Sequence, residues 1–213
     1  MTTKVQEPRV TKISPLPSEE AKWVEFQKIE WTDQEGKPRL WEAANRKTRG
    51  KSGIDAVAIA PILIHPNRPT QTIIILQYRP PVAATCIEFP AGLIDANETP
   101  EQAALRELKE ETGYEGTIVD MTPVMASDPG MTTANMTFAT VEVHLKEGDE
   151  EPEQHLESGE HIERVVLPLD ELYGRLLQYT KEGKIPDARL FHFAAGVHFA
   201  KLNAKKYGLT IDG

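Results

Sequence analysis

The chain has 213 residues, 39% of them hydrophobic and 27% charged, and it carries a formal net charge of -9. These values exclude a disordered or fibrous protein and favour one main globular domain with an appendage. The negative charge argues against binding to nucleic acid or to an anionic membrane surface. No apolar run is long enough for a membrane span. Because Cys86 is the single cysteine, no disulfide framework is expected, and a cytoplasmic location fits, with nuclear presence left open.

Residues 1–50 are expected to form a polar arm followed by a small β-hairpin domain. Strand-like runs at 22–31 and 38–46 flank the turn sequence DQEGK, as a hairpin requires. An isolated hairpin is marginal in water, so this one needs a surface to pack on, and a two-fold dimer that exchanges it would provide one. The hairpin contains all three tryptophans, Trp23, Trp31 and Trp41. These rings either pack into a core or present flat faces to a base or to a partner subunit.

Residues 51–213 are expected to form the main domain. The aliphatic runs at 56–64 and 72–78 predict central strands covered on both faces. Arg79 ends the second run and is followed by two prolines. It is either an ordinary surface arginine or a cation at the mouth of a site. Glu88 precedes the turn sequence FPAG, where it either faces a substrate or supports residues that do.

Residues 99–113 predict a helix with both ends marked. Thr99 is a hydroxyl N-cap, Pro100 occupies the first helical position, and Gln102 completes a capping box. Gly113 suits the left-handed conformation that ends a helix. At 100° per residue, one face of the helix is an apolar stripe that is expected to dock on a sheet. The stripe consists of Ala104, Leu105, Leu108 and Thr112.

The last two turns of this helix carry three carboxylates, Glu107, Glu110 and Glu111. The helix dipole disfavours negative charge there, and like charges one turn apart repel by roughly a few tenths of a kcal/mol. A bound cation would remove this conflict. Hard oxygen ligands at one helical turn suit Mg²⁺, or Mn²⁺ as a substitute. The alternative is a solvated acidic face.

The part of the chain after this helix carries further candidate site residues. Met131 lies in the small-residue turn SDPGMTTAN and is a candidate for lining a pocket. The acidic segment 146–158 is expected to be a mobile surface loop. Glu160, at its end, is placed to orient or deprotonate a water, with Glu163 as the alternative. Strands are also predicted at 116–127, 136–145 and 161–169. Two helices are predicted after them, one that begins at Asp170 and one over 186–205.

The predicted helix and the loop before it fit the pattern G-x5-E-x7-R-E-U-x-E-E-x-G-U. The fixed positions are Gly92, Glu98, Arg106, Glu107, Glu110, Glu111 and Gly113, with Leu108 and Tyr114 at the two U positions. These seven positions coincide by chance roughly once in a million sequences of this length. The segment therefore resembles the Nudix box. This resemblance implies an α/β fold, specifically an α/β/α sandwich with a mixed sheet, and metal-assisted hydrolysis of a diphosphate.

Segments beyond the box resemble the ADP-ribose pyrophosphatases of that family. They are WVEFQKIEWTDQEGKPRLWE, QYRPPV, CIEFPAGLID, the DPG turn and SGEHIE. The resemblance implies a homodimer that exchanges its N-terminal hairpins, with Trp23 and Trp41 on either side of an adenine. It also assigns Arg46 and Arg79 to the phosphates of the substrate.

For the metal ions, the resemblance implies ligation by the carbonyl of Ala91 and the carboxylates of Glu107 and Glu111. Arg106 is expected to pair with a neighbouring glutamate and hold its rotamer, and Glu110 to bind a further metal or support the others. The expected reaction is Mg²⁺-dependent hydrolysis of ADP-ribose, or a related ADP-sugar, to AMP and ribose 5-phosphate. Two alternatives stay open: a Nudix hydrolase of another nucleoside diphosphate derivative, and a sensor that binds ADP-ribose without hydrolysing it.

Overall fold

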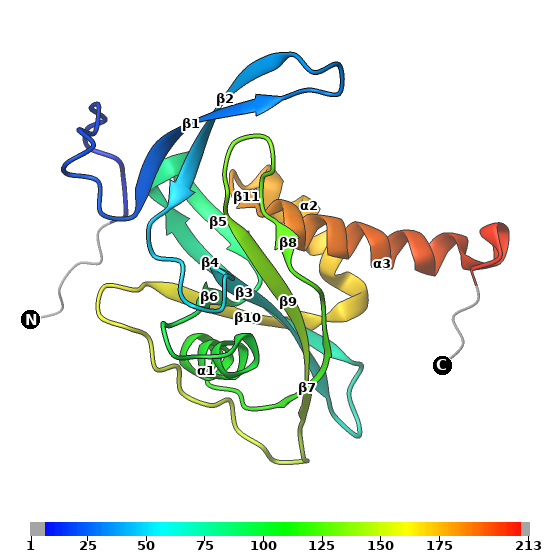
Figure 1. Ribbon diagram of the computed structural model, residues 1–213. Helices are drawn as coiled ribbons and strands as arrows, with labels where there is room; N and C mark the ends of the chain where they lie inside the picture. Colours follow the sequence, from blue (N-terminus) through cyan, green and yellow to red (C-terminus); the bar gives the residue numbers. More distant parts are fainter. Residues whose placement is uncertain (1–6, 210–213) are drawn as a thin grey trace, which may run out of the picture.

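In the computed structural model, which describes residues 7–209, a β-hairpin projects from a mixed sheet that has helices on both faces (Figure 1). The hairpin consists of β1 (Val24–Thr32) and β2 (Pro38–Arg46), which pair antiparallel along their whole length. Its turn is closed by Asp33, whose carboxylate accepts hydrogen bonds from the backbone N–H groups of Glu35 and Lys37. The predicted hairpin is confirmed, with its first strand displaced toward the turn.

The predicted N-terminal arm is only partly described, because residues 1–6 lie outside the described residues. Residues 7–17 contain neither helix nor strand. The arm nevertheless contacts the main domain, since the backbone N–H of Val10 donates to the hydroxyl of Tyr78 at 3.1 Å.

Within residues 7–209, the main sheet has nine strands in the order β11-β5-β4-β3-β9-β7, with β10, β6 and β8 attached to β4, β3 and β9. Their bounds are β3 (Ala56–Ile64), β4 (Gln71–Arg79), β5 (Ala84–Glu88), β6 (Ala91–Leu93), β7 (Thr117–Met121), β8 (Met125–Ala126), β9 (Asn135–His144), β10 (Ile162–Pro168) and β11 (Ile185–Pro186). The pairs β3–β9 and β11–β5 are parallel, and the other pairs are antiparallel. The sheet is therefore mixed, as predicted.

The sheet opens between its two central strands. β3 and β4 pair only through Ile62 with Thr72 and Leu63 with Gln71. Beyond these pairs, β6 lies beside β3 and β5 lies beside β4. The chain passes from β5 to β6 through two residues, so the end of β5 and the whole of β6 lie together at the open end. This is where the predicted site residues of both strands are found.

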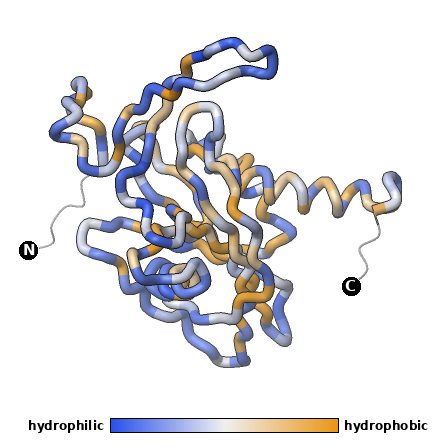
Figure 2. The backbone as a smooth tube through the Cα atoms, in the orientation of Figure 1, coloured by the Kyte–Doolittle hydropathy of each residue, from blue (hydrophilic) through white to orange (hydrophobic). Residues whose placement is uncertain are grey.

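The helices form the outer layers of the sandwich. α1 (Pro100–Thr112) covers one face of the sheet, whereas α2 (Leu172–Lys181) and α3 (Ala188–Tyr207) cover the other (Figure 1). Each face buries its own aliphatic cluster, which includes Leu108 on the α1 side and Leu176 on the α2 side. Hydrophobic residues are concentrated in the central strands (Figure 2). The predicted α/β/α sandwich is confirmed.

Both ends of α1 lie at the predicted residues. The hydroxyl of Thr99 accepts a hydrogen bond from the backbone N–H of Gln102 at 3.3 Å, and the side chain of Gln102 accepts one from the N–H of Thr99 at 2.9 Å. Gly113 ends the helix with a φ of 77°, the left-handed conformation that glycine adopts most easily.

One predicted member of the apolar stripe of α1 was wrong. Leu105 is 39% exposed, whereas Ala103 on the other side of the helix is fully buried. The buried face is rotated toward Glu111, which is itself only 3% exposed. The helix therefore packs on the sheet partly through the face that carries its acidic residues.

The C-terminal helices begin later than predicted. A 3₁₀ turn at Leu169–Glu171 comes before α2, so the α-helix starts at Leu172 instead of Asp170. α3 starts at Ala188, because the carboxylate of Asp187 caps it by accepting the N–H groups of Arg189 and Leu190. The last turns of α3 project from the rest of the molecule (Figure 1). None of the helices within residues 7–209 combines the length and the apolar character that crossing a membrane requires.

The hairpin is held to the main sheet by the loop between β8 and β9. The backbone N–H of Ala44 in β2 donates to the carbonyl of Met131 at 2.8 Å, and the N–H of Thr133 donates to the carbonyl of Ala44 at 3.0 Å. Nearby, Arg49 binds the buried carboxylate of Asp55 through two N–H groups, at 2.8 and 3.0 Å. The segment between hairpin and main domain is thus fixed by side chains of its own.

Candidate active site

Two carboxylates of α1 lie against the backbone of β6. Glu111 Oε2 accepts a hydrogen bond from the N–H of Ala91 at 2.9 Å. One turn earlier, the carboxylate of Glu107 lies so close to Gly92 that a Cβ atom added to Gly92 would be 1.7 Å from Glu107 Oε1. A side chain at position 92 would therefore occupy the place of the Glu107 carboxylate. Glycine is required here by the close approach of helix and strand.

Arg106 links the remaining charged residues of this region. Its guanidinium donates to both oxygens of Glu98 at 2.9 Å, to Glu107 at 2.8 Å and to Glu110 at 3.0 Å. A further N–H donates to the carbonyl of Leu93 in β6 at 3.0 Å. The predicted pairing of Arg106 with a neighbouring glutamate is confirmed. Because an arginine fork held at five points is rigid, it fixes the rotamer of Glu107.

The two carboxylates against β6 are unfavourably placed for ionisation. Burial raises the pKa of Glu111 to about 8; the hydrogen bond from Ala91 opposes this shift, and the negative charges of Glu107 and Glu160 add to it. Burial also raises the pKa of Glu107, against the effect of Arg106, while Glu110 and Glu160 raise it further. The site therefore has a deficit of positive charge.

The chemistry of these donors fits a hard divalent cation. Across residues 7–209, no three His, Cys, Asp or Glu side chains converge closely enough to hold a metal ion by themselves. Mg²⁺ does not need such a cage, because one or two carboxylates hold it and waters and substrate phosphates complete its shell. Glu107 and Glu111 supply two carboxylates, and a cation beside them would favour their ionised forms against the burial and the repulsion that raise their pKa values.

Arg79 and Glu88 form an ion pair at the open end of the sheet. Arg79 Nε donates to Glu88 Oε1 at 2.6 Å, and Nη2 donates to Oε2 at 3.0 Å. Glu88 is buried, whereas part of the Arg79 side chain stays exposed. The positive charge of Arg79 also acts to lower the pKa of Glu111, so the two lie near each other. Glu88 thus holds the guanidinium of Arg79 in place. The part of the guanidinium that does not face Glu88 stays accessible to an anion.

Glu160 lies in the segment between β9 and β10. Its carboxylate accepts a hydrogen bond from the N–H of Glu157 at 3.0 Å. Because its charge contributes to the raised pKa values of Glu107 and Glu111, it lies on the side of these carboxylates. Glu163 instead lines a separate cavity beside Tyr78 and the N-terminal arm. Of the two alternatives for the water-activating residue, Glu160 is the one near the box glutamates.

The hairpin tryptophans are exposed, and the strand register separates Trp23 from Trp41 within one chain. Trp23 is 61% exposed and Trp41 is 49% exposed, so the core-packing interpretation is wrong within this chain. Trp41 pairs with Ile29, six residues along the strand from Trp23, which corresponds to about 20 Å. The indole N–H of Trp41 donates to the carbonyl of Gly130 at 3.0 Å. Trp41 therefore lies beside the loop that contains the exposed Met131.

Arg46 lies at the end of β2, close to Asp55. Burial acts to raise the pKa of Asp55, but hydrogen bonds from Arg49 and from the N–H of Asn135 outweigh it, and the charge of Arg46 helps to hold that pKa below its usual range. Arg46 is half-buried. The same residue that is predicted to bind a phosphate thus also stabilises the ordered link between hairpin and main domain.

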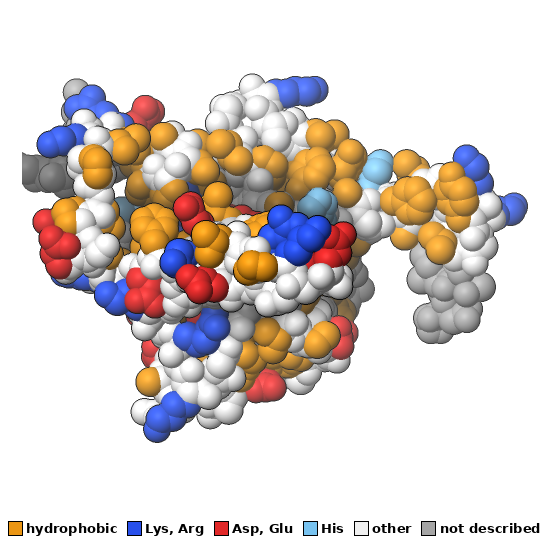
Figure 3. Space-filling model, turned by 45° about the horizontal axis from the view of Figure 1, so that its top comes forward, with side chains coloured by type: hydrophobic (Ala, Val, Ile, Leu, Met, Phe, Trp, Pro, Cys, Tyr) orange, Lys and Arg blue, Asp and Glu red, His pale blue; other side chains and the backbone are white. Residues whose placement is uncertain are grey.

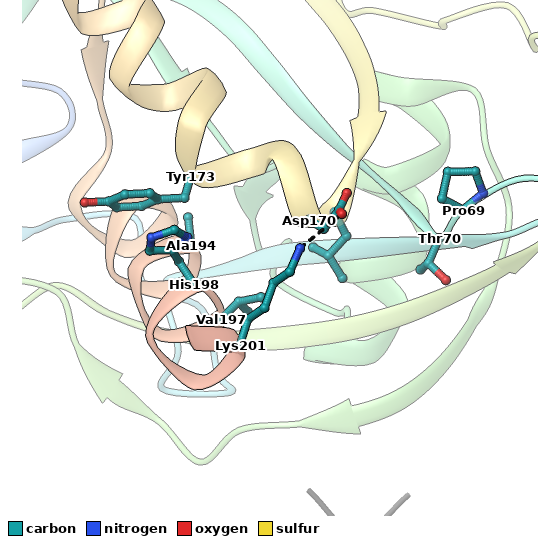
Figure 4. A pocket seen from close by; sticks show the side chains of 9 residues that line it. Pro69, Thr70, Asp170, Tyr173, Ala194, Val197, His198 and Lys201 are labelled. Atoms are coloured by element: carbon teal, nitrogen blue, oxygen red, sulfur yellow. Dashed lines mark hydrogen bonds and ion pairs between the residues drawn. The ribbon is translucent and has the colours of Figure 1, made fainter. Parts of the chain in front are cut away.

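A separate cavity of about 310 Å³ lies on the opposite face of the sheet, between the start of α2 and α3 (Figure 4). Tyr173 stacks on His198 there, with ring centroids 4.3 Å apart, and Lys201 pairs with Asp170 at 3.2 Å. The cavity is separated by the sheet from Glu107 and Glu111.

Comparison with known proteins agrees with this geometry. Residues 55–190 match the NUDIX domain. The chain belongs to the Nudix family. It is 43% identical over 194 residues to an uncharacterised Nudix hydrolase of Schizosaccharomyces pombe (91% of this chain and 94% of that protein). It is 41% identical over 184 residues to an ADP-ribose pyrophosphatase of Saccharomyces cerevisiae (85% and 80%), and 36% identical over 190 residues to an ADP-sugar pyrophosphatase of Mus musculus (88% and 86%).

One charged residue near Arg79 and Glu88 was not predicted. Arg189, in the first turn of α3, pairs with Asp187, and its charge interacts with those of Glu88 and Arg79. No local pattern announces this position, because α3 reaches the open end of the sheet only through the pairing of β11 with β5. Asp187, a residue type that caps helices, could have indicated where α3 begins, but not that this end of the helix lies near β5.

Proposed function

We propose that this Nudix hydrolase cleaves the diphosphate of ADP-ribose, or of a related ADP-sugar, to AMP and ribose 5-phosphate. The observation that carries the proposal is the pair of half-buried Glu107 and buried Glu111, with raised pKa values, beside the exposed side of Arg79. The substrate class is supported by the relatives named for ADP-ribose and ADP-sugar, whose alignments are longer than the NUDIX domain and so include flanking segments.

In the proposed mechanism, Glu107, Glu111 and the carbonyl of Ala91 hold the metal. When bound, Mg²⁺ or Mn²⁺ would neutralise the diphosphate, acidify a water and stabilise the leaving oxygen. Arg106 keeps the Glu107 carboxylate in its rotamer against β6. Glu110, hydrogen-bonded to the same guanidinium, supports this arrangement or binds a further metal.

The remaining roles concern the water and the phosphates. Glu160 orients the attacking water and accepts its proton, so that a P–O bond of the diphosphate breaks as the new one forms. Arg79 binds a phosphate oxygen with the side of its guanidinium that Glu88 leaves free. Arg46 is proposed to bind the phosphates from the hairpin side.

We also propose that the active unit is a homodimer with exchanged hairpins. Every residue of β1 is exposed or half-buried, and Phe26 is 86% exposed. Hydrophobic side chains are interspersed with charged ones on this side of the molecule (Figure 3). An apolar surface of this kind favours burial against another protein surface. The separation of Trp23 from Trp41 means that a base held between these rings requires one ring from each chain.

The deciding experiment is an assay of AMP release from a panel of nucleoside diphosphate compounds in excess Mg²⁺. We expect ADP-ribose and ADP-sugars to be the best substrates. Preference for diadenosine polyphosphates, coenzyme A or oxidised nucleotides would contradict the substrate class but not the Nudix chemistry. Calorimetric binding of ADP-ribose without any product over hours would identify a sensor instead.

A further inference from the structure

The C-terminal end of α1, which we call the Nudix helix because it carries the glutamates of the Nudix box, is capped by residues from far along the chain. The last four carbonyls of a helix lack partners within it, and here each one accepts a hydrogen bond. Lys109 O is bound by the N–H of Gly113 at 2.8 Å. Two of the other three partners come from one later segment, and the third comes from β10, which follows it. Glu110 O accepts from His155 N, Glu111 O from Gln154 Nε2 and Thr112 O from Arg164 Nη1.

The contacts of this segment are close. The N–H of His155 lies 2.8 Å from Glu110 O, and Gln154 Nε2 lies 2.6 Å from Glu111 O. A Cβ atom added to Gly113 would be 2.4 Å from the carbonyl oxygen of Glu153. The glycine that ends the Nudix box is therefore needed for two reasons: its positive φ, and the passage of this segment across it.

Arg164 fastens the segment to the neighbouring strand. Besides Thr112 O, its Nη1 donates to the carbonyl of Pro152 at 2.7 Å, and its guanidinium lies 5.3 Å from the ring centroid of Tyr114. Since Arg164 belongs to β10, it joins that strand, the segment and the end of α1. The part around residues 152–155 is thus not the free surface loop that the acidic composition predicted.

This attachment limits how far Glu160 can move. The chain is fixed to α1 at Gln154 and His155 and enters β10 at Ile162. Only six residues, 156–161, lie between these points, and Glu160 is one of them. The position that its carboxylate can reach therefore depends on the hydrogen bonds that hold the segment to the same helix that carries Glu107 and Glu111.

We propose that Gln154 and Arg164 are positioning residues for Glu160. They fix the segment 151–155 to the carbonyl end of the Nudix helix, so that Glu160 is delivered at a set distance from Glu107 and Glu111. The proposal rests on the proposed function of Glu160 as the residue that activates water. The helix carrying two of the catalytic carboxylates thus also fixes the position of the third.

The kinetic test is a double-mutant cycle between Gln154→Leu and Glu160→Gln. Alone, Gln154→Leu should lower kcat about 10-fold, as expected for a displaced catalytic group, and change KM less than about twofold. In the Glu160→Gln background, the same change should have almost no further effect, because the group that it positions no longer acts. Additive losses would overturn the proposal. Gln178→Leu, at an exposed glutamine of α2, is the control and should leave kcat unchanged.

A second measurement does not depend on activity. In Gln154→Leu, hydrogen exchange at the amides of His155 and Glu160, which bind Glu110 O and Glu157 O, should become faster, while amides of β3 keep their rates. Arg164→Lys, which can still donate to carbonyls, should preserve more of kcat than Arg164→Met. Unchanged exchange at His155, or equal kcat in the two Arg164 variants, would contradict the anchoring role. If ADP-ribose is not a substrate, the kinetic test is run with whichever diphosphate compound the substrate assay identifies. The proposed substrate and the proposed positioning role can therefore be contradicted independently of each other.

Discussion

The Nudix helix and the N-terminal hairpin carry their functional residues in opposite ways. The carboxylates of α1 are held by contacts within the chain, to the backbone of β6 and to Arg106, and the backbone carbonyl of Glu111 is bound by the segment before β10. The tryptophans of the hairpin are exposed, and the strand register keeps Trp23 and Trp41 apart. Residues of α1 can therefore be tested in a single chain, whereas those of the hairpin require a second chain.

This difference shows that each region carries an unfavourable feature of a different kind: buried carboxylates in α1, and exposed aromatic surface in the hairpin. α1 buries Glu111 next to Glu107, although both pKa values rise as a result. The hairpin exposes aromatic surface, although burying it would be favourable. Each region is unfavourable in the isolated chain, and each cost would be offset by a different component: a cation for α1, and a partner subunit for the hairpin.

The largest expected effect is on the carboxylate pair. Glu111→Gln keeps the size of the side chain and an oxygen that can accept from the N–H of Ala91, but removes the charge. We expect kcat to fall by about 100- to 1,000-fold, because electrostatic stabilisation of the transition state is the main term lost. The measurement is kcat for AMP release in excess Mg²⁺. Glu101→Gln, an exposed glutamate in the first turn of the same helix, is the matched control, and full activity of Glu111→Gln would exclude α1 as the metal site.

The next effect tests the close approach of α1 to β6. Gly92→Ala would place a methyl group where the Glu107 carboxylate lies, so that carboxylate must move by an ångström or more. A displacement of this size lowers kcat on the order of 100-fold. Gly196→Ala in α3, where an added Cβ meets nothing within 4 Å, should leave kcat unchanged. Wild-type kcat in Gly92→Ala would mean that Glu107 does not act from its position against β6.

These two regions also mark how far the sequence alone could predict the structure. The helix over 99–113 and the strand over 56–64 were predicted at their observed ends, because caps and aliphatic runs are local signals. The fit of Glu107 over Gly92, the capping of Glu111 O by Gln154 and the approach of Arg189 to Glu88 were not predicted. Each of these joins residues distant in sequence through strand register and helix packing, which no local pattern encodes.

Substitutions of the hairpin tryptophans should cause a smaller loss of function, but one that mixing of two variants can partly recover. Replacing Trp23 or Trp41 by alanine should weaken ADP-ribose binding by about 1–3 kcal/mol, the scale of base stacking on an aromatic side chain. Calorimetric titration of each variant measures this change. Trp31→Ala, in the same hairpin, is the control and should weaken binding less.

Mixing the two variants tests whether the base is held between chains. A heterodimer of Trp23→Ala with Trp41→Ala would have one site that lacks both rings and one that is intact, so a mixture should regain part of the lost activity. Mixtures of the Glu111→Gln and Gly92→Ala chains should not regain activity, because both residues lie in one chain's site. A fully active monomer, or no recovery despite proven subunit exchange, would contradict the shared site.

The smallest expected effect is on the pH dependence of folding stability in the metal-free protein. The folded chain keeps the proton of Glu111 up to a pKa of about 8, whereas the unfolded chain loses it near its ordinary value of about 4.3. Between these pH values the folded state binds more protons, so the contribution of this group to stability is present at low pH and is lost as pH rises. Glu111→Gln removes that dependence.

The variant should therefore match wild type in Tm near pH 4.5 and exceed it increasingly up to about pH 8, by on the order of 1 kcal/mol, or a few degrees. Thermal unfolding in EDTA at pH 5, 7 and 9 measures this trend, with Glu101→Gln as the control. Adding Mg²⁺ should narrow the difference, because a cation bound beside Glu111 stabilises the ionised wild-type site and not the glutamine. A Tm difference that is constant across this pH range would show that Glu111 is ionised in the folded protein without metal, and that the repulsion between the carboxylates of α1 is already relieved within the chain.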